Sequence, residues 1–246
     1  MSFASEAGHW YDADGTPHYT VEGKSGTRNT TLRDARKLNL YPSVTTIIGC
    51  AAAPGLERWK QEQVLYAALT LPEPTTSNHE EWIKAVFEDS KQQARTAAER
   101  GAEIHTAIEI MLRGRYAGSL EMYAKAAIEQ VTRCFGKQDW RTEESFAHPL
   151  GYGGKVDLHS DRVLVDFKTK EGDLAGLKLY DSHFMQLAAY ATGLGLQKPV
   201  CAVIFVRRDK PEAETIMVSS DDLDRGWRQF HALLQYWQAK TGHVPT

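Results

Sequence analysis

The stretch GYGGKVDLHSDRVLVDFKTK, residues 151–170, decides the fold that this sequence predicts. It contains two apolar runs rich in β-branched residues and joined by a short polar turn, which is typical of two adjacent antiparallel strands. An aspartate interrupts each run, Asp157 in the first and Asp166 in the second, and Lys168 follows closely. Charged side chains in strands that otherwise resemble core need a partner or a function.

Strand alternation predicts that the two carboxylates share one face of the sheet. Side chains two residues apart in a strand point the same way, so Leu164, Asp166 and Lys168 lie together. A turn at residues 160–161 would place Asp157 opposite Leu164. Asp157 and Asp166 would then be diagonal neighbours, about 7–8 Å apart.

Two inward carboxylates at this separation can bind one small cation. Mg²⁺ prefers carboxylate oxygens and keeps several waters, so it suits Asp157 and Asp166. Without a cation, the two charges would repel and one carboxylate would be driven neutral. The alternative interpretation is an edge strand whose aspartates face water and form surface ion pairs with Lys155 or Lys168.

The rest of the chain predicts an α/β domain with a central mixed β-sheet flanked by helices. Periodicity predicts helices at about 54–69, 82–113, 119–135, 181–192 and 221–240. The strands are expected at about 142–147, 154–159, 162–169, 200–207 and 215–219. Between the first two helices, residues 71–81 are rich in Pro, Thr and Ser and predict an exposed loop.

The N-terminal region predicts additions to this core rather than a second domain. Residues 9–22 alternate aromatic and polar side chains about an Asp-Gly turn, which predicts a small hairpin. A basic stretch follows at 24–37. We therefore expect a single domain, 1–246, with a hairpin and basic extension at 1–40 and the main body at 41–246.

Composition limits the classes of protein to consider. No apolar run approaches the roughly 20 residues of a membrane span, and the first residues do not resemble a signal peptide, so we expect a cytoplasmic protein without membrane contact. The net charge of −3 means that any nucleic-acid partner must be held by local basic patches. Three cysteines far apart in the sequence favour reduced thiols over a disulfide framework.

Two helical pairs add polar residues at a spacing of four. His105 and Glu109 share one helix face, and Gln186 and Tyr190 share another. Taken singly, each pair is more typical of ordinary helix packing than of a site.

The polar motifs together resemble the PD-(D/E)xK nuclease superfamily. In chain order they are GAEIH-x₃-E, E-x₂-F at Glu143, GGKVD, DFK and Q-x₃-Y. The resemblance is closest to the RecB-like branch, which includes phage exonucleases and the mitochondrial genome maintenance exonuclease. YPSVTTII and GLERWK are similar to N-terminal elements of the same enzymes, so the resemblance spans about Tyr41 to Tyr190. It implies a restriction-endonuclease-like core.

The resemblance also implies roles for individual residues. Metal ligands would be His105, Asp157, Asp166 and the backbone carbonyl of Phe167. Lys168 would be the catalytic lysine, and Glu143, which matches the glutamate of the strand before the hairpin, would be a catalytic residue with a less defined role. Glu109 would orient His105, and Gln186 and Tyr190 would hold the DNA strand.

Further candidates for DNA binding come from local composition. Phosphate contacts are expected from Arg28, Arg33 and Arg36 in the basic stretch, from Arg207, Arg208 and Lys210, and from the hydroxyls of Ser43 and Thr45. Trp59, Tyr41 and Tyr190 could stack on bases. The alternatives are solvated surface charge for the basic residues and core packing for the aromatic rings.

The implied activity is that of a Mg²⁺-dependent DNA exonuclease, with Mn²⁺ as a substitute, that leaves 5′-phosphate and 3′-hydroxyl ends. The expected substrate is DNA that is single-stranded or has single-stranded ends, in phage or bacterial recombination, repair or degradation. A recombination or single-strand-binding protein is the expected further partner. Iron–sulfur members of the branch need four cysteines, so no such cluster is expected. Alternatives are an endonuclease or flap nuclease on the same fold, or a non-catalytic DNA-binding module.

Overall fold

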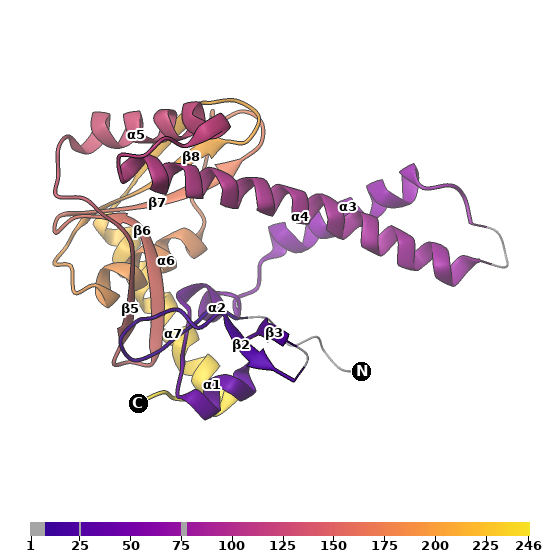
Figure 1. Cartoon of the computed structure of the whole chain (residues 1–246), viewed down its shortest axis with the longest axis horizontal. Helices are drawn as coiled ribbons and strands as arrows, with labels where there is room; N and C mark the ends of the chain where they lie inside the picture. Colours follow the sequence, from indigo (N-terminus) through magenta and orange to yellow (C-terminus); the bar gives the residue numbers. More distant parts are fainter. Residues whose placement is uncertain (1–7, 25, 75–77) are drawn as a thin grey trace.

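A five-stranded mixed sheet lies at the centre of the chain, which the computed structural model describes at residues 8–24, 26–74 and 78–246 (Figure 1). In sheet order, the strands are β5 (Arg141–His148), β6 (Tyr152–His159), β7 (Val163–Lys170), β8 (Val200–Arg207) and β9 (Ala213–Val218). Only β7 and β8 are parallel, and helix α6 (Asp181–Gly193) connects them. The predicted α/β class with a mixed sheet is confirmed.

Helices cover both faces of the sheet. On one face, Ile104 of α4 (His79–Leu112) and Val131 of α5 (Glu121–Phe135) pack with Val165 and Phe167 of β7. On the other face, α6 and α7 (Ser220–Thr241) pack against Leu164. The alternation predicted along β7 is therefore present, with apolar side chains on both faces.

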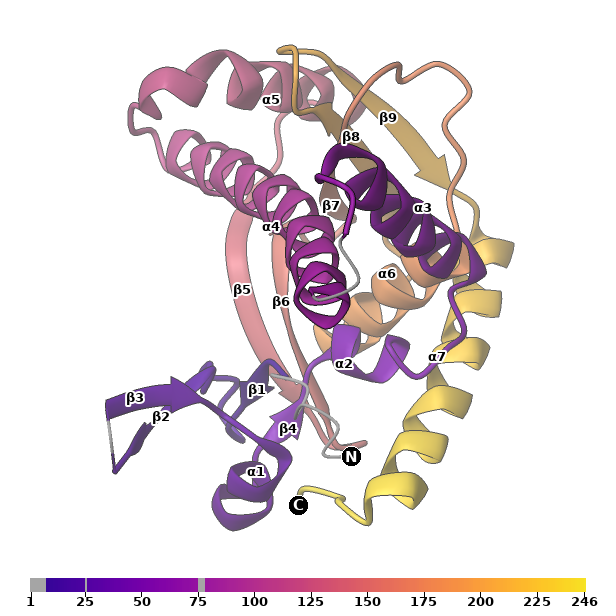
Figure 2. The same cartoon turned by 90° about the vertical axis from the view of Figure 1, so that its right-hand side faces the viewer.

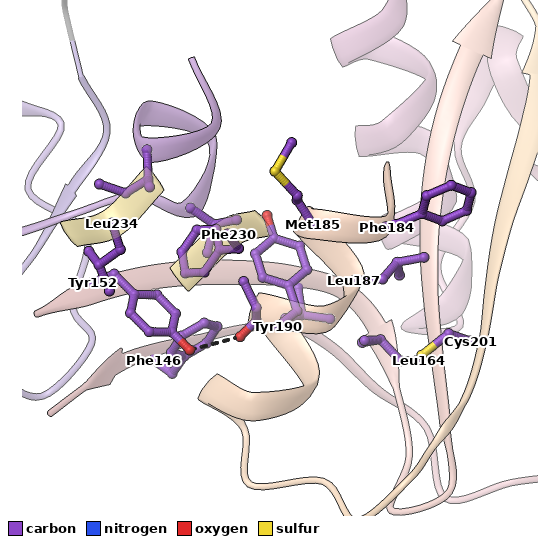
Figure 3. Packing of buried hydrophobic residues seen from close by; sticks show 14 of the residues in the cluster. Phe146, Tyr152, Leu164, Phe184, Met185, Leu187, Tyr190, Cys201, Phe230 and Leu234 are labelled. Atoms are coloured by element: carbon purple, nitrogen blue, oxygen red, sulfur yellow. Dashed lines mark hydrogen bonds between the residues drawn. The ribbon is translucent and has the colours of Figure 1, made fainter. Parts of the chain in front are cut away.

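The larger apolar cluster lies between the sheet and α6 and α7 (Figure 3). Tyr152, Phe184 and Phe230 are among its largest rings, and Tyr152 is fully buried. The Tyr152 hydroxyl donates a hydrogen bond to the Ala189 carbonyl at 3.1 Å, so burial of this polar group leaves no unpaired hydroxyl. This cluster fixes α6 against β6.

A helical arm projects from the body of the molecule (Figure 1). It consists of α3 (Pro54–Thr70) and the N-terminal half of α4, which lie side by side. Part of the loop predicted at 71–81 falls on 75–77, outside the described residues, and α4 already begins at His79. Across the described part of the chain, no helix combines the length and the apolarity that crossing a bilayer requires.

The predicted hairpin at 9–22 forms in part: the His18 N–H donates to the Trp10 carbonyl at 2.7 Å, and Tyr11 forms an antiparallel bridge with Pro17. The Asp-Gly turn forms, since the Gly15 N–H donates to the Asp12 carbonyl at 3.0 Å. However, β1 (Trp10–Tyr11) pairs with β4 (Tyr41–Pro42), beside the ends of β5 and β6 (Figure 2). Burial of Trp10 in the main core, where it is 2% exposed, explains this choice of partner.

The remaining N-terminal elements are short. A separate hairpin contains β2 (Thr20–Gly23) and β3 (Gly26–Asn29), and helix α1 (Leu32–Leu38) follows. The β-branched run after Pro42 forms helix α2 (Val44–Ile48), because the Ser43 hydroxyl caps its first turn.

Candidate active site

The turn between β6 and β7 is longer than predicted. His159 pairs with Leu164, so the predicted pairing of Asp157 with Leu164 is wrong by two residues. The turn includes Arg162, whose backbone N–H donates to the Ser160 hydroxyl at 3.3 Å. A shift by an even number leaves each side chain on its predicted face, because the side-chain period of a strand is two.

The sheet opens around Asp157. Beyond Leu158 and Val165, β6 and β7 no longer pair, and the Asp157 carboxylate accepts the Phe167 N–H at 2.8 Å. On the other side of β6, the ladder to β5 is interrupted at Glu143, whose φ of 56° lies in the left-handed region. Asp157 therefore occupies a point where its strand has lost regular pairing with both neighbours, and its side chain replaces a missing backbone acceptor.

Asp166 and Lys168 face this opening from β7. Asp166 is 3% exposed on a central strand, which excludes the edge-strand interpretation. The Lys168 ammonium contacts the Asp166 carboxylate at 2.7 Å and donates to the Gln186 carbonyl oxygen at 3.0 Å. The Gln186 amide nitrogen in turn donates to the Tyr190 hydroxyl at 3.0 Å. Gln186 thus holds the ammonium group directly, and Tyr190 orients the Gln186 amide.

The charges of the site influence one another strongly. Burial raises the pKa of Asp157 to about 6, and the nearby Asp166 carboxylate contributes to this increase. Burial acts to lower the pKa of Lys168, but Asp166 and Asp157 outweigh it, so the net shift is upward. Lys168 is therefore an ammonium ion at neutral pH, and the two aspartates crowd one another as the sequence predicted.

His105 reaches the site from α4. Its Nδ1 lies 3.7 Å from Asp157 Oδ2, and its ring meets Phe167 edge-on with the centroids 6.4 Å apart. One turn earlier, a Cβ at Gly101 would lie 2.8 Å from the Thr169 hydroxyl oxygen. Glycine at this position thus lets α4 approach β7 closely enough for His105 to face Asp157.

The donor set at the opening fits a hard divalent cation. Asp157 and Asp166 offer carboxylate oxygens, and the raised pKa of Asp157 shows that the site favours compensation by positive charge. Within the described ranges, no group of three or more His, Cys, Asp or Glu side chains is arranged to hold an ion. Mg²⁺ is usually bound by one or two carboxylates, waters and substrate phosphates, so a site of this kind suits it.

Two acidic residues of the motifs form ion pairs that the sequence did not predict. The Glu109 carboxylate contacts Arg113 at 2.9 Å, an i,i+4 pair along α4, instead of orienting His105. The Glu143 carboxylate forms an ion pair with Lys155. The Glu109 carboxylate also acts on the Lys155 ammonium, so the two ion pairs lie within electrostatic range of one another.

Several side chains that were predicted to contact phosphate are bonded to other residues of the protein instead. Ser43 is 3% exposed, and its hydroxyl accepts the Thr46 N–H at 3.0 Å, which makes it a helix cap. Arg28 forms two hydrogen bonds with Asp34, at 2.7 and 2.8 Å. Arg36 donates to the Thr241 carbonyl at the end of α7. These side chains stabilise local structure.

Two other candidates are exposed. Thr45 lies on the surface of α2, and Arg33 lies on the surface of α1. Neither side chain has an acidic partner among the residues that the structure describes. They keep the phosphate-contact role as a prediction.

The arginines of the second basic cluster form ion pairs within the protein, and two of the three predicted stacking rings are buried. Arg207 pairs with Asp209 and Glu212, and Arg208 pairs with Glu171. Tyr41 and Tyr190 are each 6% exposed, so neither ring offers a face to a base. Trp59 on the projecting arm is 38% exposed.

Residues outside the motifs also lie beside the site. They are His9, Tyr11 and Tyr19, and they lie near Lys155 of the GGKVD motif. The alternation of aromatic and polar residues at 9–22 was the signal for these three, but it indicated only a hairpin. Their position next to β6 arises from tertiary packing.

Comparisons with known proteins give distant structural likenesses. No protein-family model matches the sequence, and no curated protein matches it. A crystal structure from Eubacterium rectale named "putative exonuclease" is 13% identical, with 71% of each chain covered and a TM-score of 0.38. The crystal structure of SSO0001 is also 13% identical, covering 72% of this chain and 85% of that one, with a TM-score of 0.29. Likeness at this level does not bear on activity.

Proposed function

We propose that this protein is a metal-dependent deoxyribonuclease that degrades DNA from an end, leaving 5′-phosphate and 3′-hydroxyl products. The observation that carries the proposal is the convergence of Asp157, Asp166 and Lys168 where β6 and β7 separate. The order of polar motifs, which resembles that of PD-(D/E)xK nucleases, supports the same assignment.

Each residue of the site has a distinct task in this proposal. Asp157 and Asp166, with the Phe167 carbonyl and His105, would hold Mg²⁺ or Mn²⁺. A bound divalent ion polarises the phosphate and lowers the pKa of a coordinated water. Lys168, kept as an ammonium by the two carboxylates, donates hydrogen bonds to the attacking water or to the phosphate oxygens. Gln186 and Tyr190 position Lys168, in addition to any contact with the strand.

The biological setting follows from the resemblance alone. We propose action on DNA with single-stranded ends during phage or bacterial recombination, repair or degradation, in the cytoplasm. A recombination or single-strand-binding protein is the proposed partner. The proposed enzyme uses no iron–sulfur cluster, since the chain has three cysteines.

The decisive experiment compares linear and circular single-stranded DNA of the same sequence. With Mg²⁺, the protein should digest the linear strand to products with 5′-phosphates and leave the circle intact, and EDTA should stop the reaction. Cleavage of the circle, or cleavage of a flap only at its branch point, would replace the exonuclease by an endonuclease or flap nuclease. Binding of DNA with no cleavage of any substrate would favour a non-catalytic module.

A further inference from the structure

The N-terminal segment, residues 9–19, forms a wall beside the candidate active site. A Cβ at Gly153 of β6 would lie 2.9 Å from the Tyr11 ring, and one at Gly15 would lie 2.8 Å from the Phe146 Cα. The φ of Gly15 is +80°, which other residues adopt only with strain. These two close approaches, together with the buried Trp10, seat the segment directly on β5 and β6.

Three rings of this wall form a continuous cluster. The Tyr11 and Tyr19 hydroxyls are 3.0 Å apart, and their rings meet edge-on with centroids separated by 5.8 Å. The His9 ring stacks on Tyr19 at 4.3 Å, with 27° between the planes. Tyr11 is 2% exposed, Tyr19 is half-buried and His9 is exposed. The cluster is therefore anchored at Tyr11 and presents an aromatic surface at His9.

The cluster is close to the polar residues of the site. Lys155, two residues before Asp157 on β6, pairs with Glu143 and acts on His9: burial lowers the pKa of His9, and the Lys155 ammonium lowers it further. Burial also raises the pKa of Tyr11, and the charges of Tyr19, Tyr190 and Glu143 add to this. The rings thus lie within electrostatic range of Glu143, Lys155 and Tyr190.

We propose that His9 and Tyr19 form a stacking platform for an unpaired nucleobase of the strand that is cut. The inference rests on the proposed function, because it takes DNA as the ligand, and it assigns single-stranded DNA as the substrate next to the scissile phosphate. A base can stack on His9 only when its own face is free, which excludes a base inside a duplex. Stacking of this kind tolerates every sequence, because each base has a π-face.

The charges of the wall favour a base over a phosphate group. The Lys155 ammonium is already paired with Glu143, and the lowered pKa of His9 keeps its ring neutral at pH 7. A neutral ring attracts a base by stacking but offers a phosphate no net positive charge. Tyr41 and Tyr190, two of the three rings considered for stacking from the sequence, are buried and cannot replace this pair.

The test measures binding of a fluorescent oligothymidylate in EDTA, where metal-dependent cleavage does not interfere. His9→Ala should weaken binding about 5-fold or more, the lower end of the effect of removing a stacking ring. His9→Phe, which keeps a ring, should restore it, and blunt duplex should bind all variants equally. Tyr116→Ala removes a ring that is 77% exposed in the loop after α4 and serves as the matched control, with unchanged binding.

A second arm locates the stacked base. A single abasic site moved along the strand should weaken wild-type binding at one position, and His9→Ala should show no further loss there. Equal binding by wild type, His9→Ala and His9→Phe, with the same abasic profile, would overturn the platform even if the protein cleaves DNA. An abasic profile that depends on His9 in a protein without nuclease activity would support the platform and reject the proposed function.

Discussion

The two ends of the β6–β7 pair have opposite characters. Near the turn, Leu158 pairs with Val165, and the side chains of Leu158, Leu164 and Val165 are fully buried. At the other end the strands separate, and Asp157 faces the gap. One pair of strands thus contains both a closed apolar ladder and an open polar site within a few residues.

The difference shows how stability and chemistry can be divided along one strand pair. The closed end buries apolar surface and satisfies its backbone groups in the ladder. The open end gives up backbone pairing, and Asp157 partly replaces it by accepting the Phe167 N–H. Burial, together with crowding by the Asp166 carboxylate, raises the pKa of Asp157, which is unfavourable for the metal-free protein at neutral pH. Substitutions at the two ends should therefore have different consequences.

At the open end, the largest expected effect is on catalysis. Asp166→Ala and Lys168→Ala should each lower the rate of DNA cleavage on the order of 1,000-fold, because the first removes a proposed metal ligand and the second removes the ammonium that faces the reacting phosphate. Single-turnover cleavage measures the rate, and thermal unfolding should show a folded protein. Asp161→Ala, in the turn of the same hairpin and 83% exposed at the side chain, is the matched control and should cleave normally. Normal cleavage by Lys168→Ala would show that the open end of the β6–β7 pair takes no part in catalysis.

At the closed end, we expect loss of stability with the chemistry retained. Leu164→Ala removes a fully buried side chain and should lower the free energy of unfolding by about 2–5 kcal/mol. Urea denaturation measures this, and cleavage at low temperature should persist. Val200→Ala, at a position 48% exposed on the neighbouring β8, should cost much less. Equal destabilisation by the two variants would mean that the closed end does not anchor the sheet.

The pH dependence of stability sharpens the comparison further. The folded-state pKa of Asp157, about 6, lies above its ordinary value of 3.8, so the folded protein holds a proton that the unfolded chain releases. The corresponding stability is complete below about pH 4 and is lost as the pH rises through 6. Asp157→Asn should remove this pH-dependent loss of stability. At pH 8 it should raise the free energy of unfolding of the metal-free protein by about 1–2 kcal/mol. This is less than the whole pKa shift would give, because the Asp157 side chain is partly exposed.

Thermal unfolding in EDTA across pH 4–8 checks this expectation. Asp14→Asn, on the exposed N-terminal turn, is the control and should follow the wild type at every pH. A wild type that does not lose stability relative to Asp157→Asn above pH 6 would contradict the crowding of the two carboxylates.

The smallest of these effects concerns His105, which approaches the open end from a different element. If the His105 imidazole is a metal ligand, His105→Ala should weaken Mn²⁺ binding about tenfold, as for other polar groups around metal sites. Calorimetry measures the affinity, and DNA binding in EDTA should be unaffected. Unchanged Mn²⁺ affinity would leave His105 as a residue that packs on Phe167.

Much of the site was predictable because it depends on spacing within one element. Asp166 and Lys168 are two residues apart in a strand, and Gln186 and Tyr190 are four apart in a helix, so their shared faces follow from backbone geometry. The same periodicities located the helices and strands of the main body.

The partner of each charged side chain was not predictable from the sequence, because several groups compete for it and the packed structure decides which of them it meets. Glu109 contacts Arg113 instead of His105, and Arg28 contacts Asp34. In each case an oppositely charged side chain takes the place of the predicted partner, which was His105 for Glu109 and a DNA phosphate for Arg28. Spacing shows which residues can meet, but the packed structure determines which of them do.

The sequence by itself determined the order of the elements, the face on which each polar side chain lies and the chemical types present. Periodicity is a property of the local backbone, so these features need no knowledge of the fold. Only the tertiary structure decided that β6 and β7 separate at Asp157, and that β1 pairs with β4 in addition to its contacts across its own turn. The physical reason is that the length of a turn and the burial of Trp10 set these contacts, and both depend on the packing of the whole chain.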